Sequence, residues 1–147
     1  MRVGEPMIEP QTIRSALDEL GYNHSQDRDG DFEVPIYAFG KVVLAFISID
    51  CDNRFLEIRS IGLSGSHDEW HGSSALQVVA SEINRRYRAV KAMLESDDSE
   101  LVVCVDQWFR DAHASVDNVA FLFRLFVKVV REALGAIIAR STPLPQL

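Results

Sequence analysis

Two histidines separated by three residues are the strongest metal-binding candidates in this sequence. The segment His67-Asp68-Glu69-Trp70-His71 would bring both imidazoles to one side of a helix, where they could share a zinc ion. The zinc-protease pattern needs glutamate directly after the first histidine, but Asp68 stands there. Glycines flank the segment, which favours a loop. We therefore expect no metal and no cofactor, and a metal-dependent enzyme using the His67/His71 loop stays as an alternative.

An acidic segment, Asp27-Arg28-Asp29-Gly30-Asp31, resembles the start of a calcium-binding loop. An EF-hand loop has glycine at its sixth position and glutamate at its twelfth. In this sequence those positions hold Phe32 and Ala38. We interpret the segment as an acidic turn that leads into a strand.

Motifs for nucleotide binding and for nucleophilic catalysis are missing from the sequence. It contains no GxGxxG, GxxxxGK[ST] or GxSxG pattern. Cys104 lies in an apolar stretch, where a thiol is more often buried than nucleophilic. His24 and His113 lie in separate polar segments. We expect no catalytic residue and no enzyme, although a triad assembled from distant residues stays open at this point.

The net charge and the distribution of apolar residues limit the partners and the cellular compartment that we expect. The formal net charge is -7, which disfavours a nucleic-acid partner. No apolar stretch approaches the roughly 18 residues of a membrane span, and the start of the chain lacks the apolar core of a secretion signal. We therefore expect a cytoplasmic protein with no membrane partner, in which Cys51 and Cys104 are unpaired thiols.

One positive cluster stands out against this acidic background. Arg85, Arg86, Arg88 and Lys91 follow one another near the end of an expected helix. Cations are favoured at a helix C-terminus, so we interpret the cluster as a solvated helix end. The alternative is a surface that grips nucleic acid or an acidic peptide. No aromatic residues for base stacking are interleaved with it, which weakens the nucleic-acid alternative.

Apolar periodicity and turn residues predict eight elements. Residues 42–49 are apolar on both faces, which is typical of a central strand, whereas Pro35 cannot donate to a ladder and indicates an edge strand. Short links between strands require antiparallel pairs. The sequence thus predicts an α+β fold of order α-β-β-β-α-β-β-α, with an antiparallel five-stranded sheet and the helices on one face. The expected helices are about 10–20, 74–89 and 116–139, and the expected strands are about 32–37, 42–49, 54–61, 90–95 and 100–106.

The last expected helix is unusually apolar. In residues 119–130 only Arg124 and Lys128 are polar, so the apolar face is wider than an ordinary amphipathic stripe. Either its own sheet almost engulfs the helix or part of it meets another chain. Because a single sheet covers one side only, we favour the second interpretation and expect a homodimer. Phe121 and Leu125 flank the charged stripe and are the expected contact residues.

The order of these segments resembles the YbjN family over roughly residues 10–135. Residues 17–22 (LDELGY) look like its opening segment, and Asp29-Gly30-Asp31 looks like its acidic turn before the first strand. Asn84, Tyr87 and Lys91 match a run at the end of its second helix. The resemblance implies a fold similar to type III secretion chaperones, small acidic proteins that pair and hold partner segments. It implies a sensory transduction regulator and brings no catalytic residue with it.

We therefore expect a single YbjN-like domain over 9–140, with flexible ends at 1–8 and 141–147. Our leading hypothesis is a non-catalytic protein-binding module, a chaperone-like adaptor or sensory transduction regulator. A partner segment would add to the edge strand or lie in an apolar groove. A small-ligand sensor with an apolar pocket under the long helix is a further alternative. The candidate contact residues are Phe32, Val34, Ile36, Phe121 and Leu125.

Overall fold

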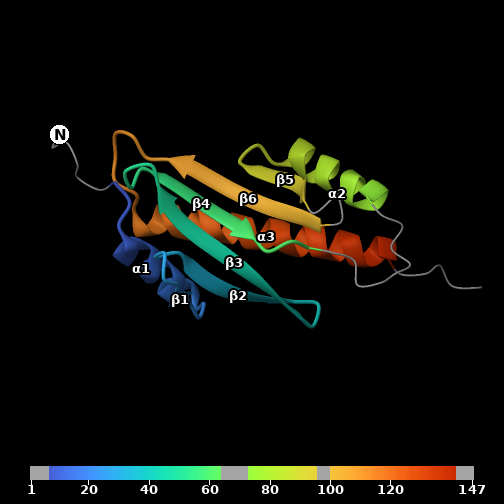
Figure 1. Ribbon diagram of the computed structural model, residues 1–147, viewed down its shortest axis with the longest axis horizontal. Helices are drawn as coiled ribbons and strands as arrows, with labels where there is room; N and C mark the ends of the chain where they lie inside the picture. The colour runs from blue at the N-terminus through green and yellow to red at the C-terminus, as the bar shows by residue number, and fades with distance from the viewer. Residues whose placement is uncertain (1–6, 64–72, 96–99, 142–147) are drawn as a thin grey trace, which may run out of the picture.

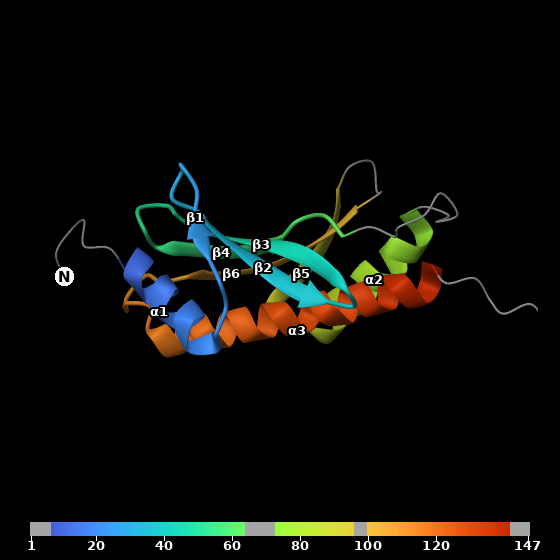
Figure 2. The ribbon, with the colours of Figure 1, turned by 90° about the horizontal axis from the view of Figure 1, so that it is seen from below.

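A computed structural model describes residues 7–63, 73–95 and 100–141 of the chain. Within them the strands form one antiparallel sheet, and the long helix α3 runs beneath it (Figures 1 and 2). The α+β class and the covering of one face are confirmed. The elements are α1 (Pro10–Leu20), β1 (Ser25–Gln26), β2 (Phe32–Ala38), β3 (Lys41–Asp50), β4 (Phe55–Ser60), α2 (Ser73–Arg86), β5 (Val90–Glu95), β6 (Glu100–Trp108) and α3 (Val116–Ser141).

The sheet has six strands in the order β1-β2-β3-β4-β6-β5, so the prediction of five strands was wrong. The missed strand is β1, in which Ser25 pairs with Glu33 and Gln26 pairs with Phe32. Two exposed polar residues carry no periodic apolar signal, which is why the sequence pattern did not reveal it. The prediction of β3 as a central strand is confirmed, because β2 and β4 flank it.

A two-residue turn joins β2 to β3. Phe39 and Gly40 both have positive φ, 52° and 70°, as a type I′ hairpin turn requires. In such a hairpin the flanking pair Ala38 and Lys41 is hydrogen-bonded, and bonded pairs then alternate along the ladder. Pro35 therefore points its missing N–H away from β3, so the β2–β3 ladder loses no bond.

The wide apolar face of α3 is covered within the chain itself. Phe123 and Phe126 are fully buried against the sheet. The helix α1 packs beside α3 on one flank and α2 on the other, and Tyr22 contacts Phe123 edge to face with ring centroids 5.0 Å apart. Most of the apolar surface of α3 is therefore covered without a second chain, because α1 and α2 as well as the sheet pack against it. Phe121, an expected dimer contact, is 64% exposed, and the homodimer stays a prediction.

The start of the domain lies earlier than expected. Met7 and Ile8 are 2% and 0% exposed, although we had assigned them to a flexible end. The Ile8 N–H donates to the Asn53 carbonyl at 3.0 Å, and the Ala114 N–H donates to the Met7 carbonyl at 2.8 Å. These bonds tie the segment to the β3–β4 turn and to the start of α3. Residues 1–6 lie outside the described residues.

Two predicted helix caps, Gly21 and Ser115, are confirmed, whereas α2 ends at Arg86 and not at the expected residue 89. Gly21 has φ 79° and closes α1, with its N–H bonded to the Asp18 carbonyl. The Ser115 hydroxyl accepts a bond from the Asn118 N–H at 3.0 Å and caps α3. The strand β6 is longer than expected, because Trp108 is its last residue and does not lie in the following loop.

Candidate protein-binding surface

The sheet face opposite α3 has no described helix over it, as Figure 2 shows. Large apolar side chains are exposed at one end of this face. Tyr37 is 65% exposed and Val42, directly opposite it in the ladder, is 58% exposed. Ile61 is 47% exposed and is held beside β3 by a bond from its N–H to the Leu44 carbonyl. Phe39 lies in the adjoining turn, with its ring on the side of α3. We call the four residues around this end of the hairpin the hairpin surface: Tyr37, Phe39, Val42 and Ile61.

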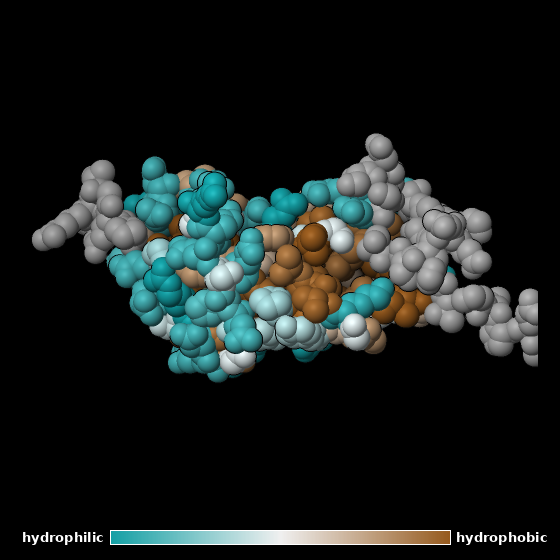
Figure 3. Space-filling model, turned by 60° about the horizontal axis from the view of Figure 1, so that its bottom comes forward, coloured by the Kyte–Doolittle hydropathy of each residue, from teal (hydrophilic) through white to brown (hydrophobic). Residues whose placement is uncertain are grey.

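A shallow groove of about 180 Å³ lies next to the hairpin surface. Val42 and Ile61 form part of its wall, and Leu134 of α3 contributes to it from the helical layer. Apolar side chains form a continuous brown area in the middle of the molecule when it is viewed from this side (Figure 3). The remaining lining residues are Lys41, Val43, Gly62 and Leu63.

Phe39 is the most unusual residue of this surface. It is 61% exposed and has φ 52°, a conformation that bulky residues rarely adopt. Asparagine or glycine would fit this turn position better. The ring lies over Gly135 of α3, where an added Cβ would come within 3.1 Å of its tip. Phe39 thus combines an unfavourable backbone conformation with an aromatic ring that is largely exposed, although its tip lies against α3.

The predicted contact residues divide into two separate groups. Phe32, Val34 and Ile36 are at most 1% exposed and face the core, so their side chains do not reach a partner. Phe121 is 64% exposed on the outer side of α3, and Leu125 beside it is half-buried. The structure does not bring the two groups together. The outward-facing neighbours of the β2 residues were overlooked because alternation does not show which face lies under the helices.

The edge of β2 is only partly open to an added strand. β1 already pairs with Glu33 and Phe32, the first residues of β2. Beyond them, Pro35 offers a carbonyl but no N–H toward the edge, and Tyr37 offers both. Few backbone groups are therefore available for strand addition, and the apolar groove is the more substantial feature of this region.

The motif at the end of α2 maintains the scaffold. The Asn84 side-chain amide bonds both the N–H and the carbonyl of Ala92, at 2.8 and 3.0 Å, and closes the outer edge of β5. The Tyr87 hydroxyl donates to Glu132 of α3 at 2.6 Å, which raises the pKa of Tyr87. Lys91 lies 3.6 Å from Asp106. These contacts hold α2 against β5 and α3.

The described residues contain little that could perform chemistry. No group of three or more metal-ligating side chains occurs among them, and the His67/His71 loop lies outside the described residues. His24 lies 2.8 Å from Asp18 and beside the Phe32 ring, and neither neighbour is a nucleophilic hydroxyl or thiol. Buried side chains fill the core between α3 and the sheet. The pockets among the described residues are grooves on the surface.

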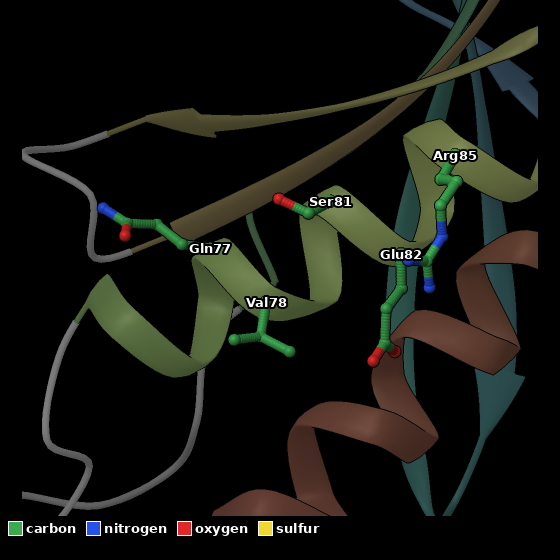
Figure 4. Close-up of a pocket in the computed structure, with 5 residues that line it drawn as sticks. All are labelled: Gln77, Val78, Ser81, Glu82 and Arg85. Atoms are coloured by element: carbon green, nitrogen blue, oxygen red, sulfur yellow. The ribbon is translucent and has the colours of Figure 1, made fainter.

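Another groove, of about 520 Å³, lies along α2. Figure 4 shows that its labelled side chains all come from this helix and that Glu82 points toward α3. Glu82 forms an ion pair with Arg140 at 3.4 Å. Ser81 is the only hydroxyl in this lining and has no histidine beside it there. The other lining residues are Gln77, Val78 and Arg85.

The two cysteines lie in different environments, and neither is in a disulfide. Cys51 is exposed in the β3–β4 turn, whereas Cys104 is buried in β6 opposite Arg59. Four residues of β4 separate that position from the turn, about 13 Å along the strand, which is too far for a disulfide. Burial, together with Glu57 and Asp106, raises the pKa of the Cys104 thiol to about 11.

No helix among the described ranges is long and apolar enough to cross a bilayer.

Comparison with known proteins gives matches to one family and to solved structures. The profile of the YbjN family, described as "Putative bacterial sensory transduction regulator", matches residues 9–139. The crystal structure of "YbjN, a putative transcription regulator from E. coli" superposes with a TM-score of 0.66 at 21% identity, covering 95% of this chain and 98% of that one. A chain of the HopA1–SchA chaperone–effector complex superposes at 0.57 and 11% identity, covering 85% and 91%. No curated protein matches. At these identities the structural matches establish the fold.

Proposed function

Because the chain belongs to the YbjN family, we propose that it is a non-catalytic protein-binding module that acts as a chaperone-like adaptor. The proposed contact is the hairpin surface, which would bury against an apolar segment of a partner protein. The observation that carries this proposal is Phe39, an exposed aromatic ring on a backbone conformation that costs stability. Strain held at an exposed residue is more often found where it serves binding than where it serves folding.

The energetics of apolar burial support this surface. Fully burying a side chain such as valine, isoleucine or phenylalanine is worth roughly 1.5–3 kcal/mol. Tyr37, Phe39, Val42 and Ile61 are each about half exposed or more. Aromatic residues at the centre of a patch commonly dominate an interface. These four neighbouring side chains are therefore suited to form its central anchor.

The size of the groove favours a polypeptide over a small ligand. Its volume of about 180 Å³ is below the roughly 300–1,000 Å³ of ordinary ligand pockets. A short apolar segment could place one side chain in the groove and lie across the exposed residues around it. The solved chaperone–effector complex is a protein–protein assembly, and the shared fold supports the same kind of partner here.

We also propose a homodimer. Its contact would lie at the hairpin surface and not on α3, where the sequence predicted it. Most apolar residues of α3 are covered within the chain, and Phe121 is the large apolar side chain of this helix that stays exposed, so α3 alone offers little surface for a dimer among the described residues. Two copies meeting at Tyr37 and Val42 would bury the same side chains as a partner segment would. Light scattering at high micromolar concentration separates the cases, because a monomeric mass contradicts the homodimer and leaves the partner-binding proposal standing.

The proposal is tested with a photo-crosslinking amino acid at position 42 and, as a control, at Glu19, an exposed residue of α1. Irradiation in cells should give protein adducts from position 42 that mass spectrometry identifies and that are missing from position 19. The variant Val42→Lys should bind the identified partner at least tenfold more weakly. Val78→Lys is the matched control, because Val78 is 43% exposed on α2. Equal adducts from both positions, or equal weakening by both variants, would contradict the proposal.

A further inference from the structure

The outer surface of the two long helices is basic in a chain whose net charge is -7. The end of α2 and the middle of α3 lie side by side there, because Arg86 is 3.4 Å from Glu132 and the Lys128 ammonium lies 5.8 Å from the Tyr87 ring centre. We call this region the basic surface. Its members are Arg85, Arg86, Arg88, Arg124, Lys128 and Arg131, all exposed.

Most of these cations are not neutralised within the described part of the chain. Among the described residues, no carboxylate forms an ion pair with Arg85, Arg88, Arg124 or Arg131. Glu132 is already engaged by Tyr87 and Arg86. Arg124 and Lys128 stand four residues apart on one helix face, an arrangement of like charges that slightly destabilises a helix. Arg86 and Lys128 make contacts between α2 and α3, whereas the charges of Arg85, Arg88, Arg124 and Arg131 do not serve the fold through ion pairs among the described residues.

One group of acidic residues lies away from the basic surface. Asp27, Asp29 and Asp31 share the β1–β2 turn. Burial, followed by repulsion from Asp27, Asp29 and Asp50, raises the pKa of Asp31. On the helices, Glu132 offsets part of the positive charge, and the excess of cations there makes a local positive field in an acidic protein.

Apolar side chains lie along the same stripe of α3. Phe121 is 64% exposed and Leu125 is half-buried. Phe121 precedes Arg124 by three residues, so the two lie on neighbouring turns of one helix face. The surface thus offers cations and exposed apolar groups within one strip.

We propose that the basic surface binds an acidic amphipathic helix of a protein partner, an inference that rests on the proposed protein-binding function and adds a second contact to it. Arg124, Lys128 and Arg131 recur at four and three residues, about 6 and 4.5 Å along the axis. Carboxylates spaced by four and three residues on a partner helix would face them in register. Leucines beside those carboxylates would pack on Phe121 and Leu125, as in helix recognition by a mixed surface.

A helical partner fits better than a nucleic acid. The net charge of -7 repels a long polyanion. A short acidic helix would lie close to the basic surface only, so the cations of that surface dominate its interaction with the chain. Phe121 and Leu125 of the strip also match leucine side chains. Electrostatic steering should make the association fast and sensitive to salt.

The experiment measures fluorescence anisotropy of a labelled 18-residue helical peptide with glutamates spaced by four and three residues and leucines beside them. The full chain should bind it, and the variant Arg124→Gln/Arg131→Gln should weaken binding about tenfold, since exposed ion pairs each contribute a few-fold. Arg28→Gln, a neutralisation in the β1–β2 turn, is the control and should leave binding unchanged. Glutamine keeps the helix propensity of α3 high, and circular dichroism verifies the fold.

Three results would overturn the inference. They are no binding of the glutamate peptide, equal binding of a peptide with lysines in place of the glutamates, and tighter binding of a 20-nucleotide single-stranded DNA. The test is distinguishable from that of the hairpin surface. Val42→Lys should leave binding of the glutamate peptide intact, so crosslinking at position 42 without peptide binding defeats this inference alone.

Discussion

The two edges of the sheet are protected in different ways. At β5, the amide of Asn84 bonds both backbone groups of Ala92, so α2 completes the ladder as a further strand would. At β2, only the two residues of β1 pair with the edge, and Pro35 removes a donor beyond them. Hydrogen bonds from Asn84 close the β5 edge. The β2 edge is protected from strand pairing by the N–H that Pro35 lacks, and exposed apolar side chains lie beside it. The difference shows that the β5 edge is tied to the fold at Ala92, and it supports our proposal that the β2 side is the one that binds a partner.

The largest effect is expected from opening the closed edge. Asn84→Ala leaves the N–H and carbonyl of Ala92 without their partner in a part-buried site. The loss should destabilise the domain by about 1–3 kcal/mol, measured by urea unfolding. Gln77→Ala, an exposed position of the same helix, serves as the control. Equal stability of the two variants would show that the closed edge does not depend on this amide.

A smaller effect of opposite sign is expected at the open side. Phe39→Asn places a residue that tolerates positive φ at the type I′ turn. The variant should keep or raise the free energy of unfolding, by up to about 1 kcal/mol, while weakening the binding of the partner found by crosslinking. A loss of more than about 1 kcal/mol would instead make Phe39 a structural residue.

Gly135→Ala sharpens this result by testing the contact beneath Phe39. Alanine favours a helix interior over glycine by about 0.5–1 kcal/mol, but its Cβ would come within 3.1 Å of the Phe39 ring tip. The gain in stability should therefore be larger in the Phe39→Asn background than in the natural sequence. A double-mutant cycle measures the coupling, and additive effects would show that the two residues do not interact.

The smallest expected effect concerns the two cysteines, whose reactivity is measured by thiol labelling. The thiolate is the reactive form, and with a pKa of about 11 only about one Cys104 thiol in a thousand is ionised at pH 8. Cys51 should label quickly at pH 8 and Cys104 only after unfolding. Because the pKa is raised in the folded state, this residue's contribution to stability is present below about pH 9 and falls as pH rises toward 11. Cys104→Ala should lose that part of the pH dependence, and rapid labelling of both cysteines would contradict the burial of Cys104.

The candidate surface could be foreseen only in part. The sequence pattern located the hairpin through Gly40 and the alternation of 32–37, and it singled out Phe121, which is exposed. It assigned contact roles to Phe32, Val34 and Ile36, whose side chains face the core. Periodicity of two separates the faces of a strand but does not say which face the helices cover. One signal in the sequence could have revealed the positive φ of Phe39. The turn between the two strands is Phe-Gly, whereas Asn-Gly is the usual pair in such a turn.

By itself, the sequence determined the order of the long elements, the caps at Gly21 and Ser115, and membership of a recognisable family. These features depend on local propensity and on spacing within a few residues, which a linear pattern records. The tertiary structure alone decided that α1 and α2 cover α3, that Asn84 bonds the edge of β5 at Ala92, and that five cations from α2 and α3, with Arg88 just beyond α2, share one surface. Such contacts join residues far apart along the chain, and they arise only when the packed core fixes which faces meet.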